Sequence, residues 1–191
     1  LRGSIITSTL TSCSATEVVA WCRAQRVSAV GIDAPCRWSL TGRARPCERE
    51  LSGFGMSCFS TPSQATGEVH PFYRWMVHGA ELFRLLTPHY GLYDGRAPRL
   101  EPLSFETFPQ AIACALAGRK LVAKRKRADR RRVLEQEGIL TDSLMNIDAI
   151  DAALCAVAAQ YVLAGRFKAH GDASEGFILV PACSSLFGFR V

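Results

Sequence analysis

The chain has 191 residues, of which 48% are hydrophobic, and it carries a net charge of +6 with a sequence pI of about 9.0. This composition is typical of a soluble globular protein, and no apolar run is long enough to cross a bilayer as a helix. The length predicts one domain over residues 1–191, with enough chain to bury a sizeable core.

Eight cysteines are scattered along the sequence without a C-x-x-C pair. This spacing indicates neither a zinc site nor a disulfide framework. Residues 1–10 lack the charged start and apolar centre of a signal peptide. We therefore expect a reduced, cytoplasmic protein with no membrane partner. Because the first residue is Leu1 and not Met, we also expect that the chain does not begin at its natural start.

The first elements predict a strand, a helix and a second strand. Residues 3–10 are β-branched and alternate, which is typical of a strand. A capping box at residues 14–17 opens a helix that ends near Arg26. Residues 27–33 (VSAVGID) are a short apolar run, typical of a buried parallel strand. This order predicts a βαβ unit and hence an α/β sheet.

Asp33 ends the second of these strands. Ligands of α/β proteins bind at the carboxyl ends of parallel strands, so this position favours a functional role. The alternative is that Asp33 only opens a turn, because Asp is a good turn residue and Ala34 is held extended by Pro35.

The middle of the chain predicts two helices separated by a loop. The first helix begins near Pro46, and residues 52–69, rich in Gly, Ser, Thr and Pro, form a long loop. Residues 71–89 predict an amphipathic helix. Its apolar stripe, which we expect in the core, consists of Phe72, Trp75, Met76, Ala80, Phe83 and Leu86.

The second half contains two further predicted strands. Residues 100–108 (LEPLSFETF) are extended, and Glu106 lies near their end. A small helix over residues 110–117 follows and stops at Gly118. Residues 176–181 (GFILVP) predict a closing apolar strand.

A basic block over residues 119–132 contains nine Lys or Arg residues among fourteen. Such a block indicates a polyanionic partner, nucleic acid or another phosphate-rich ligand. The alternative is a solvated helix face that pairs with surface acids such as Glu135 and Glu137. The residues that we expect to take substrate phosphates are Lys124, Arg127, Arg130 and Arg131.

A helix over residues 146–159 is apolar nearly all round, so it must be buried. It nevertheless carries Asp148 and Asp151, which project from the same side because they are three residues apart. Both could complement the helix dipole, with Asn146 as the N-cap, but Asp151 lies a turn further in, where the dipole has faded. The sharper hypothesis is that these carboxylates hold a divalent cation, which prefers oxygen ligands.

Three acids thus occupy positions that can face one common site. Asp33 and Glu106 lie at the ends of strands, and Asp151 lies, with Asp148, on the buried helix. Clustered carboxylates raise one another's pKa values, and a divalent cation removes that cost. Two such cations, about 3.5–4 Å apart, would activate water and stabilise the leaving oxygen of a phosphodiester. The sequence predicts that Asp33, Glu106 and Asp151 bind Mg²⁺ or Mn²⁺, and that these three and Asp148 are catalytic.

An ordered set of motifs spans nearly the whole chain: residues 31–35 (GIDAP), Arg45 with residues 47–50 (CERE), 105–109 (FETFP), 124–131, 148–152 (DAIDA) and 175–181. This set resembles the DUF429 family, whose members are described as predicted nucleases of the ribonuclease H-like fold. The D-x-x-D of the late helix is also similar to Holliday-junction resolvases of that fold.

The resemblance implies a central mixed sheet flanked by helices and a metal-dependent nuclease or phosphodiester hydrolase. The fold normally begins with a strand that bears a metal-binding Asp, yet no acid precedes Glu17 here. Either N-terminal strands are missing from this chain, or the leading Asp does not exist. The alternative function is a non-catalytic nucleic-acid or nucleotide-binding protein on the same fold.

Overall fold

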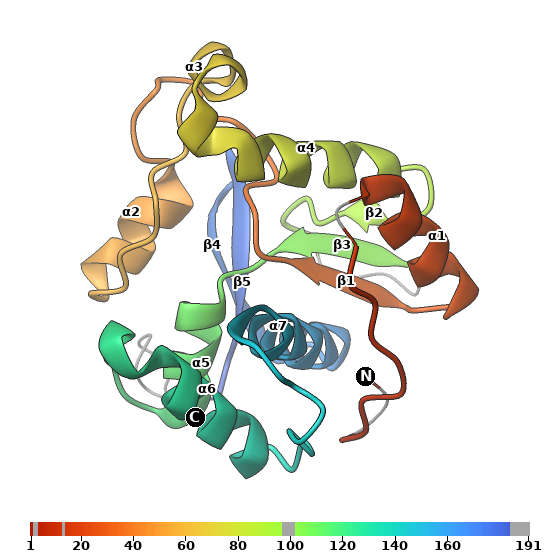
Figure 1. Ribbon diagram of the computed structural model, residues 1–191. Helices are drawn as coiled ribbons and strands as arrows, with labels where there is room; N and C mark the ends of the chain where they lie inside the picture. The colour runs from red at the N-terminus through yellow and green to blue at the C-terminus, as the bar shows by residue number, and fades with distance from the viewer. Residues whose placement is uncertain (2–3, 13, 97–101, 184–191) are drawn as a thin grey trace.

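A five-stranded mixed sheet forms the centre of the protein, as the computed structural model in Figure 1 shows; it describes residues 1, 4–12, 14–96 and 102–183. The order is β1-β3-β5-β4, and β2 also pairs with β3. The pairs of β3 with β1, β2 and β5 are parallel, and β4 with β5 is antiparallel. The strands are β1 (Ala29–Ile32), β2 (Gly91–Leu92), β3 (Leu103–Glu106), β4 (Phe167–Asp172) and β5 (Gly176–Pro181).

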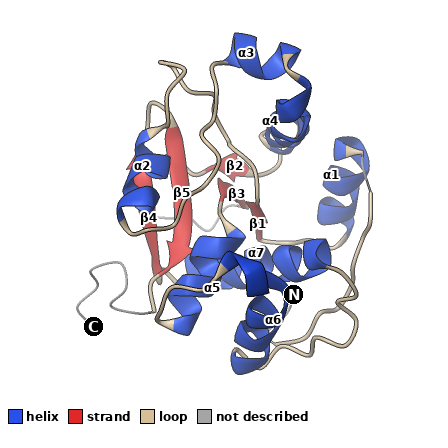
Figure 2. Ribbon diagram, turned by 60° about the vertical axis from the view of Figure 1, so that its left-hand side comes forward, coloured by secondary structure: helices blue, strands red, loops and turns tan. Residues whose placement is uncertain are grey.

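Helices cover both faces of this sheet, with α1 and α4 on one face and α5 and α7 on the other (Figure 2). None of the described helices is long and apolar enough to cross a membrane. The helices are α1 (Ala15–Ala24), α2 (Pro46–Gly53), α3 (Gln64–Val69), α4 (Arg74–Leu86), α5 (Pro109–Ala117), α6 (Lys126–Gln136) and α7 (Ile147–Leu163), with 3₁₀ turns η1 (Pro71–Tyr73) and η2 (Ala123–Arg125).

The predicted fold class is confirmed: the protein is a mixed α/β structure with an open sheet flanked by helices, consistent with the ribonuclease H-like fold. The local signals act as expected. The Ser14 side chain caps α1 by accepting from the Glu17 amide, and the Asn146 side chain caps α7 by accepting from the Ala149 amide. Gly118 ends α5 with φ of 65°, a left-handed conformation that glycine adopts without strain.

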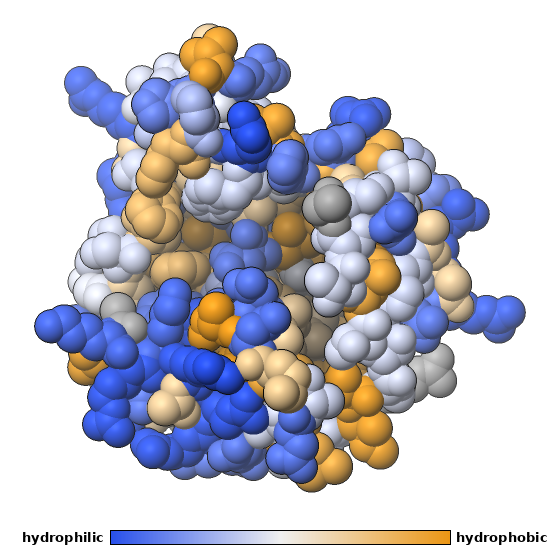
Figure 3. Space-filling model, viewed as in Figure 1, coloured by the Kyte–Doolittle hydropathy of each residue, from blue (hydrophilic) through white to orange (hydrophobic). Residues whose placement is uncertain are grey.

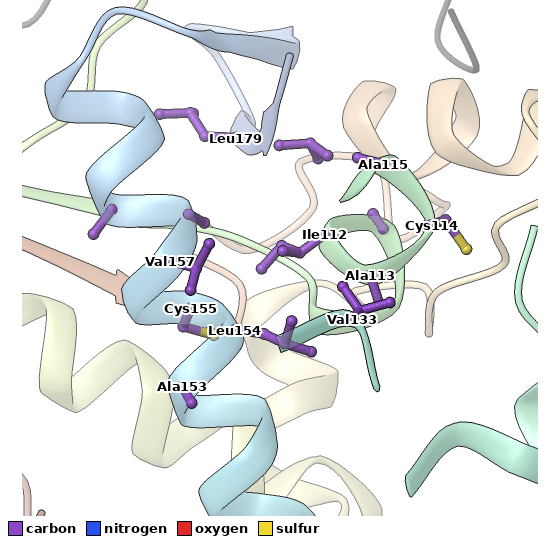
Figure 4. Close-up of a cluster of buried hydrophobic side chains, with 14 of the residues drawn as sticks. Ile112, Ala113, Cys114, Ala115, Val133, Ala153, Leu154, Cys155, Val157 and Leu179 are labelled. Carbon is purple, nitrogen blue, oxygen red and sulfur yellow. The ribbon is translucent and has the colours of Figure 1, made fainter. Parts of the chain in front are cut away.

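Two core clusters hold the layers together. The larger one joins α7, α5, α6 and α2 to strands β3 and β5, and the smaller one joins α1 and α4 to β1. Figure 4 shows that α5, α7 and β5 contribute Ile112, Leu154 and Leu179, respectively, to the larger cluster. All three side chains are fully buried. The predicted burial of α7 is confirmed, because Ile150, Ala153, Leu154, Cys155, Val157, Ala158, Ala159 and Val162 are all buried.

The predicted strand over residues 3–10 is wrong where the structure describes it. Residues 4–10 contain only an isolated bridge at Ile5, whose side chain is 62% exposed. A β-branched alternating segment becomes a strand only when a sheet edge pairs with its backbone. This segment is not part of the described sheet, although Ile6 packs against the larger core cluster. Conversely, β4 carries no strong strand pattern and is held by its antiparallel pairing with β5. Residues 100–101 of the predicted extended run lie outside the described residues.

The apolar stripe predicted for residues 71–89 is only partly a core stripe. Met76, Phe83 and Leu86 are buried, as expected. Phe72 and Trp75 are 52% and 40% exposed, so their assignment to the core is wrong. The reason is that regular α-helix begins only at Arg74, and η1 and the first turn of α4 lie beyond the edge of the smaller core cluster.

Candidate functional site

A cleft of about 600 Å³ lies at the carboxyl ends of the parallel strands β1 and β3. One wall comes from α2, the loop after it and the start of α4, and the opposite wall from α5, α6 and α7. Figure 3 shows the hollow in the middle of this face, with the strongly hydrophilic surface of α6 at its lower left. The cleft is therefore where an α/β sheet is expected to bind a ligand.

Asp33 follows the last residue of β1 and lines this cleft. Its position is fixed by the parallel pairing in which Ile32 lies opposite Glu106. The carboxylate faces the water of the cleft, but the surrounding protein still limits its solvation. Burial, and then the charge of Asp151, raise the pKa of Asp33 to about 7, although Arg130 opposes the shift.

Glu106 also lines the cleft, but its carboxylate belongs to a buried ion pair with Arg45. Arg45 donates from Nη2 to Oε1 at 2.5 Å and from Nη1 to Oε2 at 2.9 Å, and the Cys36 amide donates to Oε2 at 2.8 Å. Arg45 is 1% and Glu106 4% exposed. Glu48 pairs with the same guanidinium through Nε at 2.8 Å. This geometry makes Arg45 and its two acids a structural unit in the floor of the cleft.

The role of Arg45 is not predicted by any local pattern of the sequence, although the residue lies in one of the matching motifs. Its partner Glu106 is 61 residues away in the chain. The sequence offers one clue: Arg45 precedes Glu48 and Glu50 at the start of a predicted helix. This pattern is also common on solvated surfaces.

Asp151 of α7 lines the cleft near Asp33 and forms an ion pair with Arg130 of α6. Burial raises the pKa of Asp151 even though Arg130 and Lys126 favour its charged form. Arg130 also donates to the Gln110 side chain at 3.1 Å, which fixes its orientation. Asp148 is exposed in the first turn of α7 and is not among the residues that line the cleft.

The basic block supplies fewer residues to the cleft than its charge suggests. Of the four predicted phosphate ligands, only Arg130 lines it. Arg127 donates to the Met145 carbonyl at 2.7 Å, and Arg131 donates to the Thr141 carbonyl at 2.7 Å, so both hold the loop between α6 and α7.

Lys124 is exposed outside the cleft. Lys120 and Lys126, which sequence reasoning did not single out, do line it. Glu135 accepts from the Thr141 hydroxyl and Glu137 from the Tyr161 hydroxyl, and within the described chain neither acid forms an ion pair with the basic block.

The three predicted metal-binding acids share one cleft, but they are not equally available. Among the described residues, no group of three or more His, Cys, Asp or Glu side chains is arranged to hold a metal ion. Glu106 is occupied by Arg45, whereas Asp33 accepts no hydrogen bond within the described chain and Asp151 uses only Oδ1 for Arg130. Two carboxylates fit a Mg²⁺ ion that keeps several waters and takes its remaining oxygens from a phosphate.

A comparison with protein-family models matches residues 5–175 to the family described as "Protein of unknown function (DUF429)". The match covers most of the chain, so the protein belongs to the DUF429 family. No curated protein and no solved structure matches the chain.

Proposed function

We propose that this protein is a divalent-metal-dependent phosphodiester hydrolase that acts on nucleic acid, with Asp33 and Asp151 as its metal ligands. The observation that carries the proposal is the meeting of these two acids, each with a raised pKa, in a cleft that also contains Lys120, Lys126 and Arg130. Carboxylates held at an electrostatic cost beside cations are typical of sites that bind a metal and a phosphate together.

Each residue has a distinct task in this proposal. Asp33 and Asp151 hold Mg²⁺ or Mn²⁺, which would lower the pKa of a bound water and polarise the phosphoryl oxygen. Arg130 orients Asp151 through their ion pair. Lys120 and Lys126 bind phosphate oxygens of the substrate by charge-assisted hydrogen bonds. Glu106 and Arg45 keep the floor of the cleft rigid, so that the ends of β1 and β3 stay in register.

The test combines a metal-binding readout with an activity readout. Mg²⁺ or Mn²⁺ is expected to raise the melting temperature of the wild type, and to raise it less in Asp33→Asn and Asp151→Asn. With metal present, the wild type should cleave labelled single-stranded or duplex DNA or RNA, and both variants should lose at least about 10²-fold of that rate. Asp148→Asn is the matched control, since Asp148 lies on the same helix outside the cleft. Absence of both the thermal shift and cleavage would refute the proposal.

The second candidate is a non-catalytic binder of nucleic acid or nucleotides. The specific observation in its favour is that Glu106 is engaged by Arg45, which leaves two carboxylates rather than three. If the protein is only a binder, Asp33→Asn should bind nucleic acid with the affinity of the wild type. It could also bind more tightly, because the substitution removes one negative charge. A hydrolase would lose metal-dependent turnover in the same variant.

A further inference from the structure

Three exposed aromatic side chains form a cluster beside the cleft, and two of them, Phe59 and Trp75, line it. Phe59 in the loop after α2 is 66% exposed, Phe72 of η1 is 52% exposed, and Trp75 at the start of α4 is 40% exposed. Large aromatic side chains normally bury most of their surface in a core or an interface. Here they remain open to solvent and contribute little to the core. Exposed apolar patches of this kind mark sites that bind a ligand or a partner.

The three rings form one continuous cluster. The Phe59 ring centroid lies 5.6 Å from that of Phe72 and 6.2 Å from that of Trp75, in edge-to-face arrangements. Tyr73 extends the cluster at 5.0 Å from Phe72. These contacts hold the rings in place relative to one another, so the surface is a preformed aromatic platform rather than a set of separate side chains. We call Phe59, Phe72 and Trp75 the aromatic platform.

The platform opens onto the same cleft as the proposed active site. Phe59 and Trp75 line that cleft together with Lys120, Lys126 and Asp33. Figure 3 shows moderately apolar residues to the upper left of the hollow and a strongly hydrophilic surface at its lower left. A ligand that enters the cleft therefore meets both aromatic side chains and ammonium groups.

We propose that the aromatic platform stacks the bases of single-stranded nucleic acid whose phosphates bind to Lys120 and Lys126. Aromatic rings beside a basic groove are the features by which proteins bind single strands without reading sequence. A duplex keeps its bases stacked inside and cannot present their faces to the rings. The inference rests on the proposed function and narrows its substrate class to single strands.

The test measures binding in EDTA, so that cleavage does not interfere. A fluorescent oligothymidylate of about 12 nucleotides, a length that fits single-strand sites, is titrated with the protein. In a second series, the duplex of the same oligonucleotide is added as a competitor. Phe59→Leu/Trp75→Leu keeps an apolar side chain at both positions but removes the ring faces, and we expect its affinity for the single strand to fall on the order of tenfold. Affinity for the duplex should not change.

Two controls separate stacking from other roles of these side chains. Phe59→Tyr/Trp75→Phe retains ring faces and should bind the oligothymidylate nearly as well as the wild type. Leu140→Ala removes an exposed apolar side chain outside the cleft and should have no effect. Oligothymidylate should also quench tryptophan fluorescence in the wild type more than in Trp75→Phe, a readout that a purely structural role would not change.

The outcomes distinguish this inference from the proposed function. If the leucine variant binds the single strand like the wild type, or if the wild type binds no oligothymidylate, the platform proposal is overturned. If the wild type sediments as a dimer that Phe59→Ala dissociates, with oligonucleotide binding unchanged, the patch belongs to a second copy and the proposal also fails. If binding depends on the rings but no metal-dependent cleavage occurs, the platform stands and the hydrolase proposal does not.

Discussion

At the scale of single residues, the ionised carboxylate of Asp33 is disfavoured by its surroundings in the cleft. Its carboxylate is held near Asp151 and Glu106 in the cleft, and burial is the main reason why its pKa rises from 3.8 to about 7. The folded state therefore binds this proton more tightly than the unfolded chain. Ionisation of Asp33 therefore lowers the free energy of unfolding. This loss of stability grows as the pH rises from about 4 to about 7, and it reaches its full size above pH 7.

We predict that Asp33→Asn is more stable than the wild type at pH 8 in EDTA, because the amide removes the charge that the fold opposes. The difference in melting temperature should narrow as the pH falls from 7 towards 4, where the wild-type carboxyl becomes protonated. Thermal melts across this pH range measure it. Asp142→Asn, at an exposed position outside the cleft, is the control. A difference that stays constant with pH would contradict the assignment of the raised pKa to Asp33.

Arg45 shows the opposite case, a buried charge that stabilises because both its neighbours are acids. We predict that Arg45→Met lowers the free energy of unfolding by about 3–5 kcal/mol, since it leaves Glu106 and Glu48 buried without their cation. Urea denaturation at pH 7 is the measurement. Arg43→Met, at an exposed position, should change stability by less than about 0.5 kcal/mol.

A double variant separates the buried charge from the loss of packing. Adding Glu106→Gln to Arg45→Met should cost less than the sum of the two single changes, because the second substitution removes an unpaired charge. Strict additivity would show that the ion pair does not determine the stability of this region.

At the scale of elements, the site depends on how closely β1 approaches α7. A Cβ atom at Gly31 would lie 2.9 Å from the Cys155 carbonyl oxygen of α7 and 3.0 Å from the Phe105 ring. Only glycine therefore allows this strand and helix to pack at their present separation. The same contact brings Asp33, two residues later in the chain, close enough to Asp151 for their charges to interact.

We predict that Gly31→Ala destabilises the protein by about 1–3 kcal/mol, because the added methyl group forces β1 and α7 apart. It should also weaken the thermal shift caused by Mg²⁺, because the two carboxylates separate. Gly53→Ala is the matched control: nothing lies within 4 Å of its Cβ position, so it should be neutral or stabilise by up to about 1 kcal/mol. Equal effects of the two substitutions would contradict a role for close packing at Gly31.

At the scale of the whole molecule, the net charge of +6 is distributed unevenly with respect to the cleft. Lys120 and Lys126 line the cleft, whereas Arg127 and Arg131 are engaged with backbone carbonyls. Under the proposed function, the positive charge of the chain would supply general attraction to a polyanion, and Lys120 and Lys126 would define where the phosphates bind.

We predict that the logarithm of the affinity for single-stranded DNA falls linearly with the logarithm of the salt concentration. Lys126→Ala should reduce the magnitude of this slope by about 0.7, the value for one phosphate contact on a single strand. Lys124→Ala, at an exposed position outside the cleft in the same basic block, should change it much less. Equal effects of the two variants would place the phosphates outside the cleft.

The sequence by itself determined those features whose causes lie within one or two turns of chain. The caps at Ser14 and Asn146, the stop at Gly118 and the buried character of α7 depend on neighbours in sequence, and each occurs as expected. The positions of Asp33 and Glu106 at strand ends follow from the same local patterns.

Only the tertiary structure decided which of these side chains are free to contact a ligand. Whether Glu106 is free depends on Arg45, 61 residues away, and whether Phe72 and Trp75 are buried depends on where the core beneath α4 ends. A local pattern shows that a side chain is acidic or apolar. Its partners come from segments distant in the chain, and packing in three dimensions alone brings those segments together.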